Sequence, residues 1–192
     1  NTTSGILKYY DGSVFGTKAH NPPKPVVIEL RKVAEMQGSS VGTDGSITIG
    51  GAKSLNQLIA LLKKTSETDM GHLQIMNHLQ RVASNQIRNV GGFAGNLAFA
   101  RQFPTFPSDC ALVLCAAGAT LSVISPVHVG QNKLISTTIS VEEYLGSPYD
   151  PKTPLIILSM TIPSLTRNVL FQSFKMSVRR ENSHATINFA AN

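Results

Sequence analysis

The chain has 192 residues, of which 42% are hydrophobic and 15% charged, and its formal net charge is +6. This composition is typical of a globular protein with one large or two small cores, and it excludes a largely disordered chain. The longest apolar run, 111–119, is far shorter than the roughly 20 residues of a membrane-spanning helix. The basic residues are too dispersed for a nucleic-acid groove, so we expect neither membrane nor nucleic acid as a partner. The positive charge either lies on a solvated surface or attracts a phosphate-bearing ligand.

The first half of the chain is predicted to combine short strands with two helices. Residues 24–33 (KPVVIELRKV) indicate a strand after a proline-rich loop. The Asp-Gly pair inside residues 39–51 (SSVGTDGSITIGG) separates alternating apolar residues and is typical of a β-hairpin. Ser54 is predicted to cap a helix, because Gln57 stands at the reciprocal capping-box position. A second helix is expected over residues 72–83 (HLQIMNHLQRVA), ending as the chain enters a glycine-rich stretch.

The second half is predicted to hold two further helices and several strands. Ser108 is expected to cap a helix that Gly118 terminates, and Ser140 a shorter helix with Glu143 in its capping box. The segments 119–125, 155–163, 169–180 and 182–192 are expected to contain strands. Because the strands are grouped rather than strictly alternating with helices, the pattern favours an α+β fold over a doubly wound one.

The glycine-rich stretch 86–100 (QIRNVGGFAGNLAFA) holds three glycines and an asparagine within six positions. It fits neither the dinucleotide fingerprint G-x-G-x-x-G nor the Walker loop, since no Gly-Lys-Ser/Thr follows. We interpret it as a loop whose backbone amides can approach an anionic ligand, because no side chain stands in the way. A tight turn without a ligand is the alternative, and the spacing does not decide between the two.

The sequence gives no support to metal binding or hydrolytic catalysis. Cys110 and Cys115 are five residues apart in a predicted helix, so their side chains point about 140° apart and form neither a disulfide nor a metal pair. Reduced, buried thiols of an intracellular protein fit them best. The five histidines have no metal-ligand spacing, and surface or core positions are expected for them. No Gly-x-Ser-x-Gly elbow is present.

Several segments, in order along nearly the whole chain, resemble one known family. The stretch 86–100 followed by FPSDCALVLCAAGATLSV (106–123) closely resembles the FAD-binding domain of the molybdenum hydroxylases, the xanthine dehydrogenase and aldehyde oxidase family. Residues 25–36 (PVVIELRKVAEM) and 44–58 (DGSITIGGAKSLNQL) are similar to its early strand, hairpin and helix start. Residues 171–182 (FQSFKMSVRREN) carry its Phe-Lys-x-x-x-Arg-Arg pattern.

The resemblance implies an FAD-binding fold of the vanillyl-alcohol-oxidase, or PCMH, type, which is α+β and grips the cofactor's diphosphate with two glycine loops. Asn1 to Gly5 resemble the end of the first loop, and Gly92 to Asn96 match the second, with Ala94 where the family usually has glycine. The implied cofactor-binding residues are Asn1, Thr2, Thr3, Ser4, Gly5, Val82, Gly92, Phe93, Ala94, Gly95, Asn96, Asp109, Ile157 and Lys175.

The implied roles differ along the chain. Amides at the glycines suit a diphosphate. Val82 stands where some members have an aromatic ring near the adenine, and Ile157 stands where an aliphatic residue lines the adenine side. Asp109 occupies the place of the flavin-binding aspartate, and Lys175 that of a lysine beside the flavin ring. No residue is implied to be catalytic toward the organic substrate or to bind a metal.

As a whole, the resemblance implies a piece of a larger, cytoplasmic enzyme. Residues 1–165 would be the main FAD-binding subdomain without its N-terminal part, and residues 166–192 the start of its C-terminal part, cut short. Electrons from hydroxylation at a molybdopterin site would pass through [2Fe-2S] clusters on other domains to FAD, and then to NAD or dioxygen. Those domains would be the partners, in a homodimer, and the piece alone is expected to be inactive. The alternatives are the medium flavoprotein subunit of a bacterial carbon monoxide or nicotinate dehydrogenase-like enzyme, and a non-catalytic remnant that no longer binds FAD.

Overall fold

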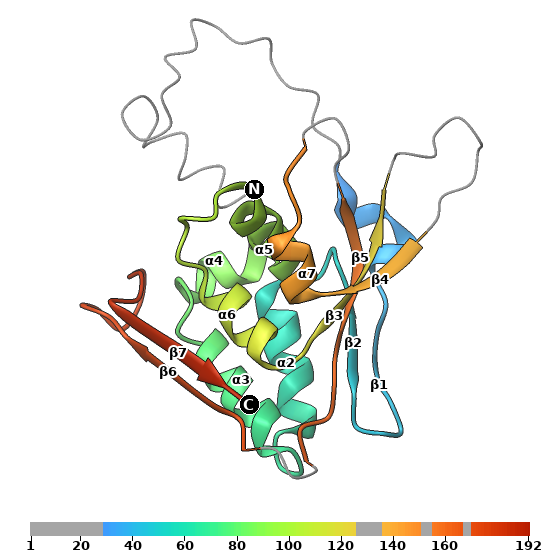
Figure 1. The fold of residues 1–192 in the computed structure, drawn as a ribbon. Helices are drawn as coiled ribbons and strands as arrows, with labels where there is room; N and C mark the ends of the chain where they lie inside the picture. Colours follow the sequence, from blue (N-terminus) through green and yellow to red (C-terminus); the bar gives the residue numbers. More distant parts are fainter. Residues whose placement is uncertain (1–28, 126–135, 151–154, 167–169) are drawn as a thin grey trace, which may run out of the picture.

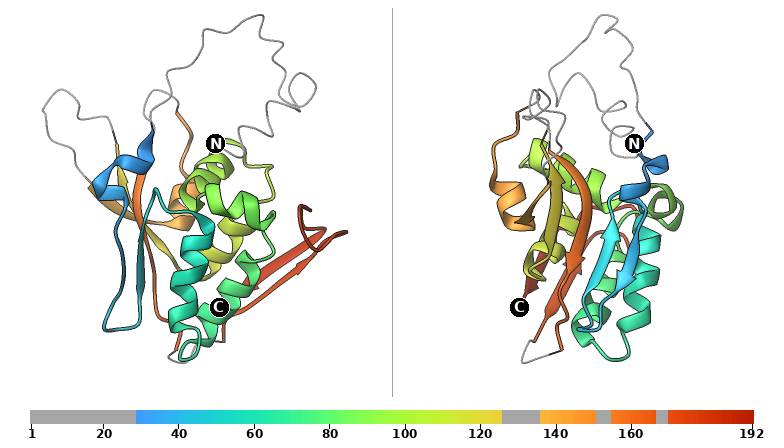
Figure 2. Two further views of the ribbon diagram at one scale, coloured as in Figure 1. Left: turned by 180° about the vertical axis from the view of Figure 1, so that it is seen from behind. Right: turned by 90° about the vertical axis from the view of Figure 1, so that its right-hand side faces the viewer.

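The computed structural model describes residues 29–125, 136–150, 155–166 and 170–192. It confirms the predicted α+β class. A layer of helices lies between a five-stranded sheet and a separate two-stranded sheet (Figure 1, Figure 2). No helix within the described ranges is long and apolar enough to cross a membrane.

The five-stranded sheet is antiparallel throughout, with the strand order β1-β2-β5-β3-β4. Its buried residues, which include Ile49, Leu121 and Met160, pack against helix residues such as Leu58 and Leu114 in one hydrophobic core. The strands are β1 (Ser39–Val41), β2 (Ile47–Gly50), β3 (Thr120–Ile124), β4 (Ser136–Ser140) and β5 (Ile156–Ile162).

In the described part of the chain, the helical layer is built from six short helices. They are α2 (Leu55–Thr65), α3 (Met70–Leu79), α4 (Asn85–Val90), α5 (Phe93–Gln102), α6 (Asp109–Ala116) and α7 (Val141–Gly146), and two 3-10 turns, η1 (Leu30–Lys32) and η2 (Ala34–Met36), precede them.

The local signals for turns and helix ends are confirmed. Gly45 has a φ of 84° in the turn between β1 and β2, a backbone conformation that glycine adopts without a steric penalty. Ser54 and Ser140 both form complete capping boxes, and Ser108 caps α6 by accepting a hydrogen bond from the amide of Ala111. Gly118, with a φ of 65°, follows the end of α6.

Three predicted elements differ in the structure. Residues 30–32 form the 3-10 turn η1 and not a strand, and the first part of that predicted strand, 24–28, lies outside the described residues. The helix expected over 72–83 ends at Leu79, and Ala83 adopts a φ of 50°, which no helix continues through. Within the segment 169–180, where a strand is expected throughout, the structure forms only the shorter strand β6 (Gln172–Met176) among the described residues.

The two-stranded sheet pairs β6 (Gln172–Met176) with β7 (Ile187–Ala191). In this register Lys175 lies opposite Asn188, and Phe174 lies opposite Phe189. Successive side chains point to opposite faces of a strand, so Lys175 and Asn188 share the face that packs on α3 and α6. The opposite face carries Phe174 and Phe189, which are 53% and 54% exposed.

Candidate functional site

Gly92 begins helix α5 at a point where the backbone touches α2. Gly92 forms an isolated β-bridge with Ser54, and the amide of Leu55 donates to the carbonyl oxygen of Gly91 at 2.9 Å. A Cβ atom at Gly92 would lie 2.8 Å from the carbonyl oxygen of Lys53. Only glycine fits this close approach. The predicted glycine loop is therefore the start of a helix, which corrects the loop interpretation of residues 92–96.

The first turn of α5 leaves backbone donors available. The amide of Asn96 donates to the carbonyl oxygen of Gly92, and the amides of Ala94 and Gly95 have no acceptor among the described residues. A Cβ atom at Gly95 would meet nothing within 4 Å, so the space beside this residue is open. Free amides and the positive end of the helix dipole favour an anion here. Ala94 has ordinary helical geometry, so its replacement of the family's glycine causes no backbone strain.

Asn96 connects this turn to helix α6. The hydroxyl of Ser108 donates to Oδ1 of Asn96 at 2.5 Å, while the same Ser108 oxygen accepts from the amide of Ala111. The Asn96 amide oxygen thus holds the N-termini of α5 and α6 together rather than facing outward. Asp109, the first residue of α6, directly follows the Ser108 that makes this bond.

Asp109 and Lys175 form a buried ion pair. Nζ of Lys175 lies 2.5 Å from Oδ2 of Asp109 and donates a second hydrogen bond, at 3.0 Å, to the carbonyl oxygen of Arg81. The side-chain amide of Asn188 donates to the other carboxylate oxygen at 2.6 Å. Lys175 is 2% exposed and Asp109 8% exposed. We name a group of five residues the Asp109 cluster: Asp109, Lys175, Arg81, Asn188 and the nearby His78.

Two polar atoms of the Asp109 cluster have no partner within the described part of the chain. They are Nε2 of His78, on α3, and Oδ1 of Asn188. Buried polar atoms in proteins are nearly always hydrogen-bonded, so each of these two calls for a partner such as a water or a ligand atom. The cluster therefore offers one histidine nitrogen, one amide oxygen and a third Lys175 N–H to a bound polar group.

Burial lowers the pKa of His78 below its ordinary value of 6.5, and Lys175 and Arg81 act in the same direction while the Asp109 charge opposes them. A histidine that is held neutral in the fold takes up its proton first in the unfolded chain. Between the lowered pKa and 6.5 the unfolded state binds more protons, so the free energy of unfolding falls as the pH is lowered below 6.5.

We expect His78→Gln to reduce this loss of stability at acid pH. One titrating group contributes a slope of at most about 1.4 kcal/mol per pH unit, and glutamine does not titrate. Urea unfolding between pH 7.5 and 5, for the parent chain and the variant, measures both slopes. Identical slopes would show that His78 is not held neutral by the fold.

The other residues predicted to bind the cofactor differ in how close they lie to the Asp109 cluster. Val82 follows α3 and packs against the hydrophobic core, and its carbonyl oxygen accepts a hydrogen bond from Arg88. It is the neighbour in sequence of Arg81, whose carbonyl oxygen belongs to the Asp109 cluster. Ile157 is 4% exposed and belongs to the hydrophobic core, and its strand β5 lies on the other side of the helical layer from the β6–β7 sheet (Figure 1). The structure thus does not bring Ile157 into the cluster. Asn1, Thr2, Thr3, Ser4 and Gly5 lie outside the described residues.

The cysteines are free thiols in helix α6. Burial, together with the neighbouring Asp109 charge, raises the pKa of Cys110 to about 12. Burial also raises the pKa of Cys115. Both therefore stay protonated near neutral pH and are unsuited to nucleophilic chemistry.

His78, Asn188 and Arg88 take part in this region but are not among the site residues predicted from the sequence. A signal existed for His78, which stands three residues after Ile75 and so falls on the buried side of α3. No local signal marks Asn188, because its contact with Asp109 spans 79 positions of the chain.

Comparison with known proteins identifies the family. Residues 14–165 match the family described as FAD binding domain in molybdopterin dehydrogenase. This match covers most of the chain, and the chain belongs to that family.

Among curated proteins, the chain is 31% identical to aldehyde oxidase 4 of Arabidopsis thaliana over 181 residues, which are 91% of this chain and 13% of that protein. It is 29% identical to probable aldehyde oxidase 1 of Oryza sativa subsp. japonica, over 93% of this chain and 12% of that protein. The chain thus spans about an eighth of the length of these relatives.

Among solved structures, quinoline 2-oxidoreductase from Pseudomonas putida 86 superposes with a TM-score of 0.63 and 16% identity, covering 84% of this chain and 50% of that one. Carbon monoxide dehydrogenase from Oligotropha carboxidovorans superposes with a TM-score of 0.61 and 18% identity, covering 84% and 51%. These similarities show that the fold is shared.

The residues present fit the cofactor in the family's description. FAD carries a diphosphate, which matches the free amides of Ala94 and Gly95 at the start of α5. Its ring has a polar edge, which matches the orphaned atoms of His78 and Asn188 in the Asp109 cluster.

Proposed function

We propose that this chain holds FAD in a molybdenum hydroxylase of the aldehyde oxidase and xanthine dehydrogenase kind. In such an enzyme, electrons from iron-sulfur clusters on another domain would reach NAD or dioxygen by way of the flavin. One observation carries the proposal. The Asn96–Ser108 hydrogen bond joins an open helix N-terminus to a buried cluster that has unsatisfied polar atoms.

Each part of this site would perform a separate task. The amides of Ala94 and Gly95 would bind the diphosphate, with Gly92 and Phe93 fixing the position of the helix start. The Asp109 cluster would orient the sugar-like chain and the polar edge of the ring. Val82 would supply an apolar contact. Residues 1–5 would add a second set of amides at the diphosphate, and Ile157 would lie toward the adenine.

The electrostatics of the cluster are suited to a stable, oriented cofactor. Bound FAD supplies the ability to exchange electrons one or two at a time. Lys175 places a positive charge at the site, and two acceptors fix its ammonium group. Because the carboxylate of Asp109 is bonded on both oxygens, neither charge needs to reorganise when a polar group is bound.

A second candidate is the medium flavoprotein subunit of a carbon monoxide dehydrogenase-like enzyme. The fold similarity to carbon monoxide dehydrogenase from Oligotropha carboxidovorans favours it. The 31% identity to a plant aldehyde oxidase, against 18% to the carbon monoxide dehydrogenase chain, favours the first candidate. In either enzyme, the iron-sulfur and molybdopterin parts would be the partners of this chain.

We expect the purified chain to bind FAD saturably, and Gly95→Val to weaken that binding at least tenfold. A Cβ atom added at this position meets no described atom within 4 Å, so a valine side chain would extend into the open space through which a ligand reaches the amides. Quenching of flavin fluorescence measures the dissociation constant.

The matched control is Ala98→Val, which adds the same branched side chain to an exposed position of the same helix. It should bind FAD as the parent chain does. A folded parent chain that binds no FAD would identify a non-catalytic remnant. Equal binding by the Gly95→Val variant would mean that the α5 N-terminus does not hold the diphosphate.

A further inference from the structure

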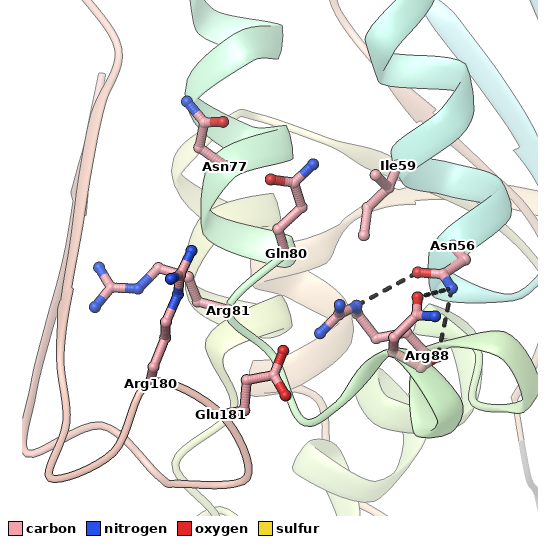
Figure 3. A pocket seen from close by; sticks show the side chains of 9 residues that line it. Asn56, Ile59, Asn77, Gln80, Arg81, Arg88, Arg180 and Glu181 are labelled. Carbon is pink, nitrogen blue, oxygen red and sulfur yellow. Dashed lines mark hydrogen bonds between the residues drawn. The ribbon is translucent and has the colours of Figure 1, made fainter.

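A second candidate site is a polar cavity beside the Asp109 cluster, with which it shares Arg81. It has a volume of about 1010 Å³ and lies among α2, α3, α4 and the segment after β6. Figure 3 shows Arg81, Arg88 and Arg180 around it, with Glu181 as the acidic residue in its lining. A cavity of this size is at the upper end of the range for small-molecule sites.

The charge balance of this cavity favours an anion. Three arginines and one glutamate are among the residues that line it. No ion pair joins Arg81, Arg88 or Arg180 to an acidic group within the described ranges. Arginine's planar fork of donors is well suited to the oxygen atoms of a phosphate group.

Arg88 provides the strongest evidence for a ligand. It is only 7% exposed, yet its hydrogen-bond partners among the described residues are neutral: Nη1 donates to the carbonyl oxygen of Val82 at 2.7 Å, and Nε to Oδ1 of Asn56 at 3.4 Å. Its Nη2 has no acceptor among the described residues, and the guanidinium faces the space between Gln80 and Glu181 (Figure 3). A buried charge without a counter-ion is costly, and a bound anion would remove that cost.

The cavity wall is already arranged to present this arginine. The side-chain amide of Asn56 donates to Oδ1 of Asn85 at 2.8 Å and to Oδ1 of Asn89 at 2.6 Å, which leaves its own oxygen toward Arg88. The exposed amides of Asn77 and Gln80 line the same cavity and can donate to, or accept from, hydroxyl groups. The lining therefore combines a phosphate-binding corner with groups suited to a sugar.

We propose that this cavity binds a sugar phosphate or a nucleotide, with its phosphate on Arg88, Arg81 and Arg180. The proposal does not rest on FAD binding by the Asp109 cluster, because Asp109, Lys175 and Gly95 do not line the cavity. The two sites are nevertheless neighbours. The carbonyl oxygen of Arg81 accepts from Lys175, while the Arg81 side chain lines the cavity.

Isothermal titration of the full 192-residue chain with ribose 5-phosphate, at constant ionic strength, tests the proposal. We expect one saturable site, at least tenfold weaker in the double variant Arg81→Gln/Arg180→Gln, since each lost charged hydrogen bond weakens binding by about tenfold or more. Both arginines are exposed, so the fold should be retained. Arg88→Lys, which keeps the charge and loses the fork, should also weaken binding.

The matched control is the double variant Lys63→Gln/Lys64→Gln, which removes two positive charges from the exposed end of α2 and should bind as the parent does. An equal loss of affinity in this control would show that the weaker binding reflects net charge alone, and it would overturn the proposal. So would the absence of saturable binding by a chain whose circular dichroism shows it to be folded.

Two further arms define the ligand and separate this site from the cofactor's. Inorganic phosphate should bind more weakly than ribose 5-phosphate, and equal affinity would contradict the sugar contacts. Saturating ribose 5-phosphate should leave the FAD titration unchanged. If it displaces FAD, the arginine cavity is the cofactor's own diphosphate site and the proposal of a second site is wrong.

Discussion

Replacing Lys175 by methionine is expected to lower the free energy of unfolding by about 3–5 kcal/mol, the cost of removing one partner from a buried ion pair. Asp109 is 8% exposed and would lose the ammonium group that lies 2.5 Å away. The carbonyl oxygen of Arg81 would also lose its donor. Methionine has nearly the length of lysine, so loss of packing contributes little to the expected effect.

Urea unfolding followed by circular dichroism measures this change. The double variant Asp109→Asn/Lys175→Met should recover most of the lost stability, because an asparagine needs no counter-ion and can still accept from Asn188. Lys64→Met, at an exposed lysine, should change stability by less than about 0.5 kcal/mol. A loss below about 1 kcal/mol for Lys175→Met would show that the pair is open to solvent.

Asp69→Ala is expected to cost about 2–5 kcal/mol, because this one carboxylate serves two purposes. Its Oδ1 caps α3 by accepting from the amide of His72 at 3.0 Å, a contact worth about 0.5–2 kcal/mol. Its Oδ2 accepts from the amide of Leu165 at 2.8 Å and from the hydroxyl of Ser164 at 3.1 Å. Leaving the buried Leu165 amide without an acceptor costs a further 1–3 kcal/mol or so.

Ser54→Ala provides the comparison for this prediction. Ser54 caps α2 in the same manner, and its hydroxyl bonds no distant side chain or amide among the described residues, so its loss should cost only about 1 kcal/mol. The difference between the two variants in urea unfolding isolates the tertiary role of Asp69. Equal losses would mean that the link between α3 and the segment after β5 contributes nothing to stability.

Local chemistry explains why part of the fold could be predicted. The turn at Asp44-Gly45, the serine caps at 54, 108 and 140, and the end of α6 at Gly118 each depend on a few neighbouring residues. Their signals are complete within the sequence window that forms them. The order of segments in the family resemblance supplied the fold and the cofactor, which the family match confirms.

The glycine stretch shows why other parts could not be predicted. Glycine disfavours helix, so a cluster of glycines was interpreted as a loop. Gly92 is nevertheless required at the start of α5, because the carbonyl of Lys53 approaches it from a segment about 40 positions earlier. Helix α4 was missed for a related reason, since its six residues are too few for a helical pattern.

The Asp109 cluster depends still more on distant contacts. The resemblance selected Asp109 and Lys175 separately, and the structure joins them across 66 positions of the chain. Neither the pairing nor the contribution of Asn188 follows from any local pattern. A cluster of this kind becomes visible only when α6 and the β6–β7 sheet are placed together.

The ion pair also bears on where this protein can be divided. Asp109 lies within residues 14–165, the range of the family match, whereas Lys175 and Asn188 lie beyond it. A polypeptide trimmed at residue 165 would lose both groups that bond the Asp109 carboxylate, together with the sheet that packs on α3 and α6. A transferable unit of this chain therefore includes the two-stranded sheet, and a chimera should not be joined between β5 and the end of β7.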